Sequence, residues 1–197
     1  MKSKVLLGAI AVIGMLPSIA LAEMSLGDKY QNLDIIYAND WREDNLDMPW
    51  SDVVIVEDDF DGQYLAVFDR EKRSSLSVEV GIISEWSKKQ LKVNFYHKVK
   101  QFIGKSPLKI GYAERIALKV GDSVFKLESK DGIYQVTPEM AKAFANAPDK
   151  IVKMRVYPSE NDGIGDVGAL QEVTIELDME TIDAWKSIYG NQEIAAQ

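Results

Sequence analysis

Short apolar runs separated by polar turn residues recur along most of this chain. Between Leu91 and Ile103 the alternation is explicit, with one face formed by Val93, Phe95, His97 and Val99 and the other by Lys92, Asn94, Tyr96, Lys98 and Lys100. A half-buried β-strand explains this period of two better than a helix does. Similar runs predict further strands at residues 53–56, 64–68, 76–83, 115–120, 123–127, 133–136, 151–157 and 173–177.

Two segments carry the signals of helices. Thr137 supplies a capping hydroxyl and Pro138 a first-turn proline, and Met140, Phe144 and Ala147 fall on one side of the short helix that begins there. A C-terminal helix is expected between Asp178 as its cap and Gly190 as its stop, with an apolar stripe formed by Ile182, Trp185, Ile188 and Tyr189. A further short helix is expected near Leu33 to Tyr37.

The order of these elements predicts a mainly β fold. Because the strands follow one another without long helical crossovers, we expect an antiparallel two-sheet β-sandwich with two or three short helices, the C-terminal one across an edge or end. No repeat or linker divides the chain, so residues 51–197 are predicted to form a single domain. Residues 23–50 lack a clean period and are interpreted as an irregular acidic lead-in.

The first 22 residues have the three parts of a secretory signal peptide. Lys2 and Lys4 precede the apolar run 5–16, and Ala20 and Ala22 supply the small residues that a signal peptidase needs. The run is shorter than the roughly 20 residues that span a bilayer. Cleavage after Ala22 and a periplasmic or secreted product without a membrane span are therefore expected. The chain has no cysteine, which excludes lipid attachment at cysteine, disulfides and thiolate chemistry.

The charge is strongly acidic and unevenly spread. The net charge of −8 becomes −10 when the two lysines of the leader are removed, which argues against nucleic acid as a partner. Residues 23–61 carry 12 acidic and two basic side chains, whereas residues 86–113 carry seven lysines and no acid. This asymmetry is the clearest one in the chain.

The lysine-rich segment supplies the candidate binding site. Lys92, Lys98 and Lys100 lie with Tyr96 on the expected solvent side of their strand, a suitable surface for an anionic envelope component such as lipopolysaccharide, or for an acidic protein. Two alternatives remain open. The lysines can protect an exposed strand edge, or they can face the acidic lead-in before Asp61.

Two acidic loops are candidates for calcium. Glu57 to Gly62 places carboxylates at alternate positions before a glycine, but the twelfth residue from Glu57 is Phe68, so the closing carboxylate of a calcium loop is missing. Asn161 to Asp166 is a second loop with few carboxylates. Both are interpreted as turns, and no metal site is predicted.

No catalytic residue or cofactor is predicted either. His97, the only histidine, is in phase with the apolar face of its strand, and we expect its ring nitrogens to bond to backbone. Ser123 and Lys126 match a Ser-x-x-Lys spacing that requires a helix, but they fall in a predicted strand, where residues three apart point to opposite faces.

Residues 115–190 resemble exported β-sandwich proteins of the invasion-associated locus B type. The resemblance is one of element order: a hairpin at 115–127, a strand and helix at 133–147, a strand at 151–157, and a last strand and helix from Val173. Members of that family often carry cysteines in this region, and this chain has none. The resemblance implies a secreted, envelope-associated sandwich and assigns no site residue.

The sequence thus favours an exported, non-enzymatic, envelope-associated binding or interaction module. The alternatives are a hydrolase or isomerase whose site is assembled from Asp, Glu, Ser and Tyr residues without a recognisable motif, and a structural subunit of a surface assembly. A deep pocket that gathers two or more carboxylates would favour the enzyme. A shallow surface and an open sheet edge would favour the module or the subunit.

Overall fold

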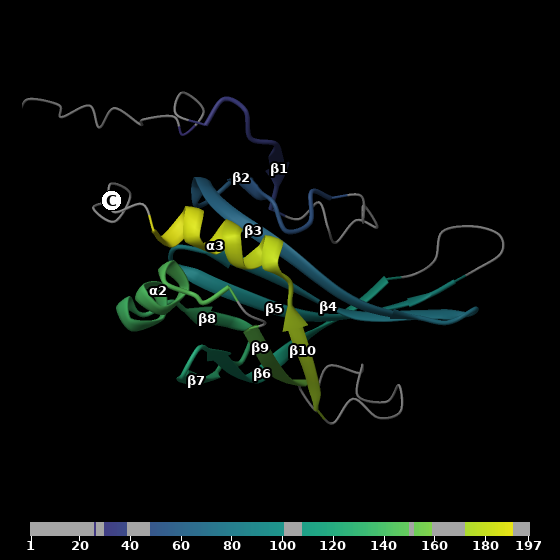
Figure 1. The fold of residues 1–197 in the computed structure, drawn as a ribbon. Helices are drawn as coiled ribbons and strands as arrows, with labels where there is room; N and C mark the ends of the chain where they lie inside the picture. Colours follow the sequence, from purple (N-terminus) through teal and green to yellow (C-terminus); the bar gives the residue numbers. More distant parts are fainter. Residues whose placement is uncertain are drawn as a thin grey trace, which may run out of the picture.

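The computed structural model of the chain describes residue 26 and residues 30–38, 48–100, 108–149, 152–158 and 172–190. These residues are mainly β, as expected, and Figure 1 shows the two helices against one face of a large mixed sheet. The strands are β1 (Ile35–Tyr37), β2 (Val53–Asp58), β3 (Gly62–Ser74), β4 (Val78–Ser87), β5 (Gln90–Val99), β6 (Leu108–Val120), β7 (Ser123–Glu128), β8 (Ile133–Gln135), β9 (Val152–Pro158) and β10 (Val173–Leu177). The helices are α2 (Pro138–Ala145) and α3 (Met179–Tyr189).

The ten strands form one connected sheet in the order β1-β2-β3-β4-β5-β6-β9-β10, with β7 paired to β6 and β8 to β5. Among the described strands every pair is antiparallel except β1 with β2. Strand β6 joins the two halves of the sheet, because its start pairs with β5 and its end with β7 and β9. The register of β6 with β9 shifts between Ala113 and Arg115, at the boundary between these two parts of β6.

The main core lies where both helices pack on the sheet. Ile182, Trp185 and Ile188 of α3 are fully buried, which confirms the predicted stripe. The Trp185 ring lies 4.3 Å from that of Trp86 on β4 and 4.8 Å from that of Phe144 on α2, measured between centroids. This aromatic cluster therefore ties the two helices to the centre of the sheet.

Both helix starts agree with the sequence. The Thr137 hydroxyl accepts a hydrogen bond from the Met140 amide at 3.3 Å, and the Asp178 carboxylate accepts one from the Thr181 amide at 2.8 Å. These bonds satisfy backbone donors that have no partner inside a helix. No helix in the described part of the chain is both long and apolar enough to cross a membrane.

The short helix expected near Leu33 to Tyr37 is a wrong prediction, since Ile35–Tyr37 is strand β1. It runs parallel to β2, with Ile35 opposite Ile55. The amide of Ile55 donates to the Asp34 carbonyl at 2.9 Å, and that of Ala38 to the Glu57 carbonyl at 3.1 Å. Pairing with an existing sheet edge thus overrides the weak local signal of this segment.

A second apolar cluster covers the opposite face of β2 to β5. Ile36 and Met48, which the sequence placed in an irregular lead-in, pack there with buried residues of the sheet that include Phe68 and Tyr96. The middle of β5 is consequently buried on both of its faces. The described parts of residues 23–50 therefore contribute to the core. The expected signal peptide, residues 1–22, lies outside the described residues.

Strands β3 and β4 are longer than predicted and project beyond the helices, toward the right of Figure 1. We call residues 70–80 of this hairpin, with residues 96–100 and 108–110 of the neighbouring strands, the arm. Leu76 lies in the turn at its tip and is 97% exposed, so the strand expected to start there starts at Val78. Behind the tip, a Cβ added at Gly81 would meet the ring of Tyr96 at 2.5 Å, so the tyrosine packs onto the glycine.

Candidate functional site

The arm carries the candidate binding surface. Across β3, β4 and β5, one row of directly opposed residues consists of Lys72, Gly81 and Tyr96. The next row on the same face consists of Ser74, Glu79 and Lys98. Directly opposed residues share a face of the sheet. Lys98 and Lys100 were expected on one face, and they are joined there by two basic residues of β3. We call this set the basic face; its members are Arg70, Lys72, Lys98 and Lys100.

The arm differs in charge from the rest of the protein. It contains six basic residues, Arg70, Lys72, Arg73, Lys98, Lys100 and Lys109, and two acidic residues, Glu71 and Glu79, which gives a charge of +4. The whole chain has a charge of −8, so the remainder carries −12. A positive projection on a negative body directs an anionic partner to one end of the molecule.

The basic side chains are held by contacts of different kinds. Lys100 Nζ donates to the Ser75 carbonyl at 2.9 Å, near the tip of the neighbouring hairpin. The guanidinium of Arg70 lies 4.7 Å from the ring centroid of Trp50, a cation–π contact with the segment before β2. The charges of Lys100 and Arg70 are therefore positioned by contacts with other parts of the fold.

Tyr96 is not at the surface, which corrects the prediction that it lies beside the lysines on the solvent side. It is 1% exposed, and Asn94 is 4% exposed, because the second apolar cluster covers this part of the face. The Tyr96 hydroxyl donates to Glu79 Oε1 at 3.0 Å. Burial, with help from the Glu79 carboxylate, raises the pKa of Tyr96. Tyr96 thus supports the arm from inside and does not present a ring to a ligand.

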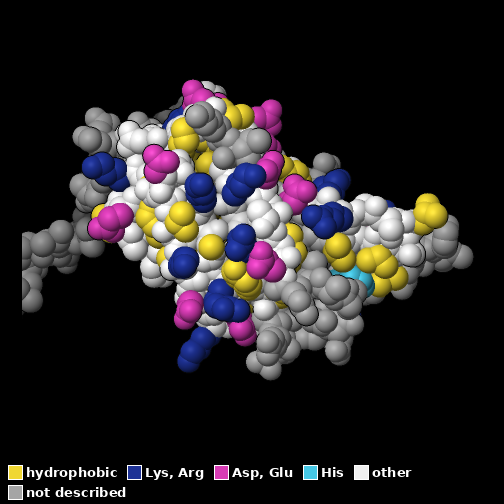
Figure 2. Space-filling view, turned by 60° about the horizontal axis from the view of Figure 1, so that its bottom comes forward, with side chains coloured by type: hydrophobic (Ala, Val, Ile, Leu, Met, Phe, Trp, Pro, Cys, Tyr) yellow, Lys and Arg dark blue, Asp and Glu magenta, His cyan; other side chains and the backbone are white. Residues whose placement is uncertain are grey.

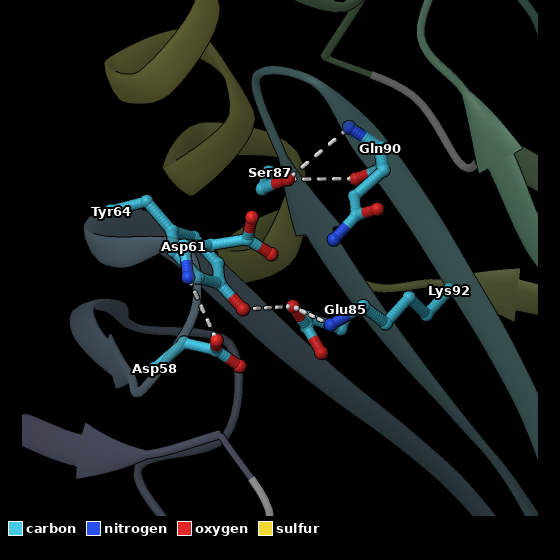
Figure 3. A network of polar contacts seen from close by, with 7 residues as sticks. All are labelled: Asp58, Asp61, Tyr64, Glu85, Ser87, Gln90 and Lys92. Atoms are coloured by element: carbon cyan, nitrogen blue, oxygen red, sulfur yellow. Dashed lines mark hydrogen bonds and ion pairs between the residues drawn. The ribbon is translucent and has the colours of Figure 1, made fainter.

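Lys92 also differs from the other two predicted lysines, because it is used inside the protein (Figure 3). Its Nζ lies 3.1 Å from Glu85 Oε1, and the Tyr64 hydroxyl donates to the same oxygen at 2.8 Å. The Lys92 and Glu85 side chains are only 18% and 4% exposed. Burial and the Glu85 charge raise the pKa of Tyr64, which stays protonated as a donor. Lys92 therefore pairs inside the protein, with Glu85 of β4, and not with the acidic lead-in.

Replacing Lys92 by methionine is expected to lower the free energy of unfolding by about 1 to 2 kcal/mol. This is less than the roughly 3 to 5 kcal/mol for breaking a fully buried pair, because Tyr64 still donates to Glu85. Urea denaturation measures the loss. Lys119→Met, at an exposed position of β6, is the control and should change stability by less than about 0.5 kcal/mol. Equal effects of the two substitutions would contradict the internal role of Lys92.

The acidic segment Glu57 to Gly62 forms the turn between β2 and β3. Asp58 Oδ1 accepts hydrogen bonds from the amides of Phe60 at 2.8 Å and Asp61 at 3.0 Å, and these bonds lower the pKa of Asp58. Gly62 has a φ of 71°, which favours glycine. Within the described residues no group of three or more His, Asp or Glu side chains is arranged to hold a metal ion. The second loop, Asn161 to Asp166, lies outside the described residues.

His97 lies near the core, as expected, and is 7% exposed. The expected bonding of its ring to the backbone is wrong for Nδ1, which has no hydrogen-bond partner among the described residues. Val99, predicted on the same apolar face, is 37% exposed at the end of the strand.

Ser123 and Lys126 lie on strand β7, which forms a hairpin with β6. The Ser-x-x-Lys motif needs both residues on one face of a helix, so this match is not a catalytic motif.

A buried polar cluster that no sequence motif marks lies between β3 and the start of α3. Thr181 Oγ1 donates to Asp69 Oδ1 at 3.1 Å and lies 2.9 Å from the hydroxyl of Ser51. Ser51 donates in turn to Asp178 Oδ2 at 3.4 Å. Burial raises the pKa of Asp69 to about 6, helped by the nearby Asp178 charge and opposed by the Thr181 hydrogen bond. Ser51 has a φ of 66°, in the left-handed region.

A shallow pocket of about 30 Å³ lies on the opposite face of the arm from the basic face, where β10 crosses it. Its lining residues are Glu71, Lys72, Arg73, Val80, Gly81, Ile82, Phe95, Val173 and Ile175. Glu71 is the only carboxylate among them. This pocket does not gather the paired acids that general acid and base catalysis uses.

Comparison with known proteins gives no match, whether to family models, to curated sequences or to solved structures. The resemblance of residues 115–190 to the invasion-associated locus B type therefore stays a prediction.

Proposed function

We propose that this protein is an exported, non-enzymatic binding module of the cell envelope, whose basic face contacts a phosphate-bearing envelope lipid. The observation that carries the proposal is the arm, which has a charge of +4 on a chain of net charge −8. Such an asymmetry orients the molecule toward an anionic surface and speeds their encounter. An acidic protein, the other partner class considered, would approach the same charges.

The shape of the arm supports binding more than catalysis. The basic face lies on a projecting set of strands, and the pocket behind it is shallow with one carboxylate. The feature best suited to an enzyme is the cluster around Asp69 and Asp178. Its members Ser51, Asp69 and Thr181 are at most 7% exposed and are hydrogen-bonded to one another, so the cluster fits a structural role.

Export is proposed on the leader features of residues 1–22. The β-sandwich scaffold is proposed on the shared core: residues from both halves of the sheet, such as Ile55 of β2 and Ile175 of β10, belong to one apolar cluster. This arrangement supports two layers joined through β6. Periplasmic or secreted localisation is proposed on the same leader.

The proposal is tested by vesicle binding. The mature protein should bind vesicles that contain phosphatidylglycerol and should not bind pure phosphatidylcholine vesicles. Changing Lys72, Lys98 and Lys100 together to glutamine should weaken binding about a hundredfold, since each lysine near an anionic surface contributes about 1 kcal/mol. Raising salt from about 0.05 to 0.2 M should weaken wild-type binding steeply.

A control triple variant removes the same charge elsewhere. Lys119, Lys126 and Lys130 are exposed residues of β6, β7 and the turn after β7, away from the arm. Their change to glutamine should leave vesicle binding within a few-fold of wild type, since surface charges beyond about 10 Å are screened. Equal losses in both triple variants, or no binding by the wild type, would refute the basic face as the binding surface.

A further inference from the structure

A row of basic groups crosses the face of the arm opposite to the basic face. Arg73 of β3 lies opposite Val80 of β4, Val80 lies opposite His97 of β5, and His97 lies opposite Lys109 of β6. Residues directly opposed in this way project from the same face. With strands about 4.8 Å apart, the row is about 15 Å long at the backbone, within reach of long side chains from both ends. Arg73 and Lys109 are exposed, and Val80 is half-buried.

His97, inside this row, has an unused polar atom. The residue is 7% exposed, and its Nδ1 has no hydrogen-bond partner among the described residues. Figure 2 shows the histidine, in cyan, beside hydrophobic side chains in yellow at the arm. A buried ring nitrogen without a partner is costly, and such atoms are rare in folded proteins. Arg73 and Lys109, one on each side of His97 in the row, favour an anionic partner for this atom.

An apolar pocket adjoins the row. The next row on the same face contains Glu71, Ile82 and Phe95. The pocket of about 30 Å³ lies over Ile82 and Phe95 and is closed on one side by Val173 and Ile175 of β10. That space holds about two water-sized groups, enough for the end of a small apolar substituent. Glu71, also on its wall, disfavours a second negative charge there.

We infer that this face of the arm binds a phosphate monoester that carries a small apolar group. The phosphate lies among Arg73, His97 and Lys109, and the apolar group enters the pocket over Ile82 and Phe95. A phosphate monoester has a charge between −1.5 and −2, roughly, and three acceptor oxygens, which match three donors better than a carboxylate does. The three phosphate donors include no lysine of the basic face, although Lys72 also lines the pocket. The site goes beyond the proposed function.

Titration calorimetry with the full mature protein and hexyl phosphate tests the site. Hexyl phosphate should bind saturably at one molecule per chain. Hexanoate and inorganic phosphate should each bind at least about tenfold more weakly, because hexanoate lacks the phosphate and inorganic phosphate lacks the apolar chain. Arg73→Gln and Lys109→Gln, at exposed positions, should each weaken hexyl phosphate binding about tenfold. The ring-nitrogen resonances of His97 should shift on binding.

The control separates this site from the basic face. Lys98→Gln combined with Lys100→Gln should weaken vesicle binding and leave hexyl phosphate binding unchanged. Vesicle binding that fails while hexyl phosphate binds would overturn only the proposed function. Absence of saturable hexyl phosphate binding, equal affinity for hexanoate, or no effect of Arg73→Gln and Lys109→Gln would each overturn the site.

Discussion

Replacing Trp185 by alanine is expected to lower the free energy of unfolding by about 3 to 5 kcal/mol. The side chain is fully buried, and it contacts both the Trp86 and the Phe144 rings. Its removal therefore loses apolar burial and leaves a cavity between α3, α2 and the sheet. The Trp185 Nε1 has no hydrogen-bond partner among the described residues, so the loss comes from packing.

Urea denaturation followed by circular dichroism measures this effect. Trp185→Phe keeps a ring in the cluster and should cost clearly less than Trp185→Ala. Val124→Ala is the matched surface control, because Val124 is 54% exposed on β7, and it should change stability by less than about 0.5 kcal/mol. An unfolding midpoint that Trp185→Ala leaves unchanged would show that α3 does not anchor the core.

The second large effect concerns Asp69 and pH. The pKa of Asp69 is about 6 in the folded protein, because of burial and the Asp178 and Glu71 charges, against an ordinary value of 3.8. A raised folded-state pKa means that the folded protein holds the proton more tightly than the unfolded chain does. The contribution of Asp69 to the stability of the protein is therefore largest below pH 4, and it is lost as the pH rises through about 6. From pH 4 to 7.5 the loss from Asp69 alone is about 2 kcal/mol.

Asp69→Asn keeps the shape and removes the charge, so it tests this prediction. Its free energy of unfolding relative to wild type should rise by about 2 kcal/mol between pH 4 and pH 7.5. Comparing the two proteins at each pH cancels the titration of other groups, such as Asp58, whose lowered pKa acts in the opposite direction. Asp52→Asn, at an exposed position next to Ser51, is the control and should show no such rise. A difference between Asp69→Asn and wild type that is independent of pH would contradict the raised pKa.

Much of the fold can be predicted from the period of two and the capping residues. Local sequence signals are enough for the strands from residue 53 onward and for the hairpin turn at Gly121. The same holds for both helices and their caps. Strand β1 escapes prediction because three residues at a sheet edge are fixed by pairing with β2 rather than by their own pattern. The length of the arm escapes prediction because residues 70–74 are polar and lack the apolar alternation that marks a strand, and they are held in the sheet by pairing with β4.

The candidate site shows the same limit. Alternation correctly places Lys98 and Lys100 on one face, but it cannot show that residues near Ile36 and Met48 cover Tyr96. Lys72 is missed because it joins that face only through the pairing of β3 with β4. Glu85 as the partner of Lys92, and Thr181 as the partner of Asp69, are contacts between elements that sequence spacing does not encode.

Hydrogen–deuterium exchange in the presence of phosphatidylglycerol vesicles tests the central claim most directly, because it locates the contact without any substitution. If the arm is the binding element, amides of residues 70–80 and 96–100 become protected, and those of β7 and α2 exchange as in the free protein. Protection should disappear at high salt, where exposed charges are screened. Protection confined to another surface, or none on the arm while the protein is bound, would contradict the account.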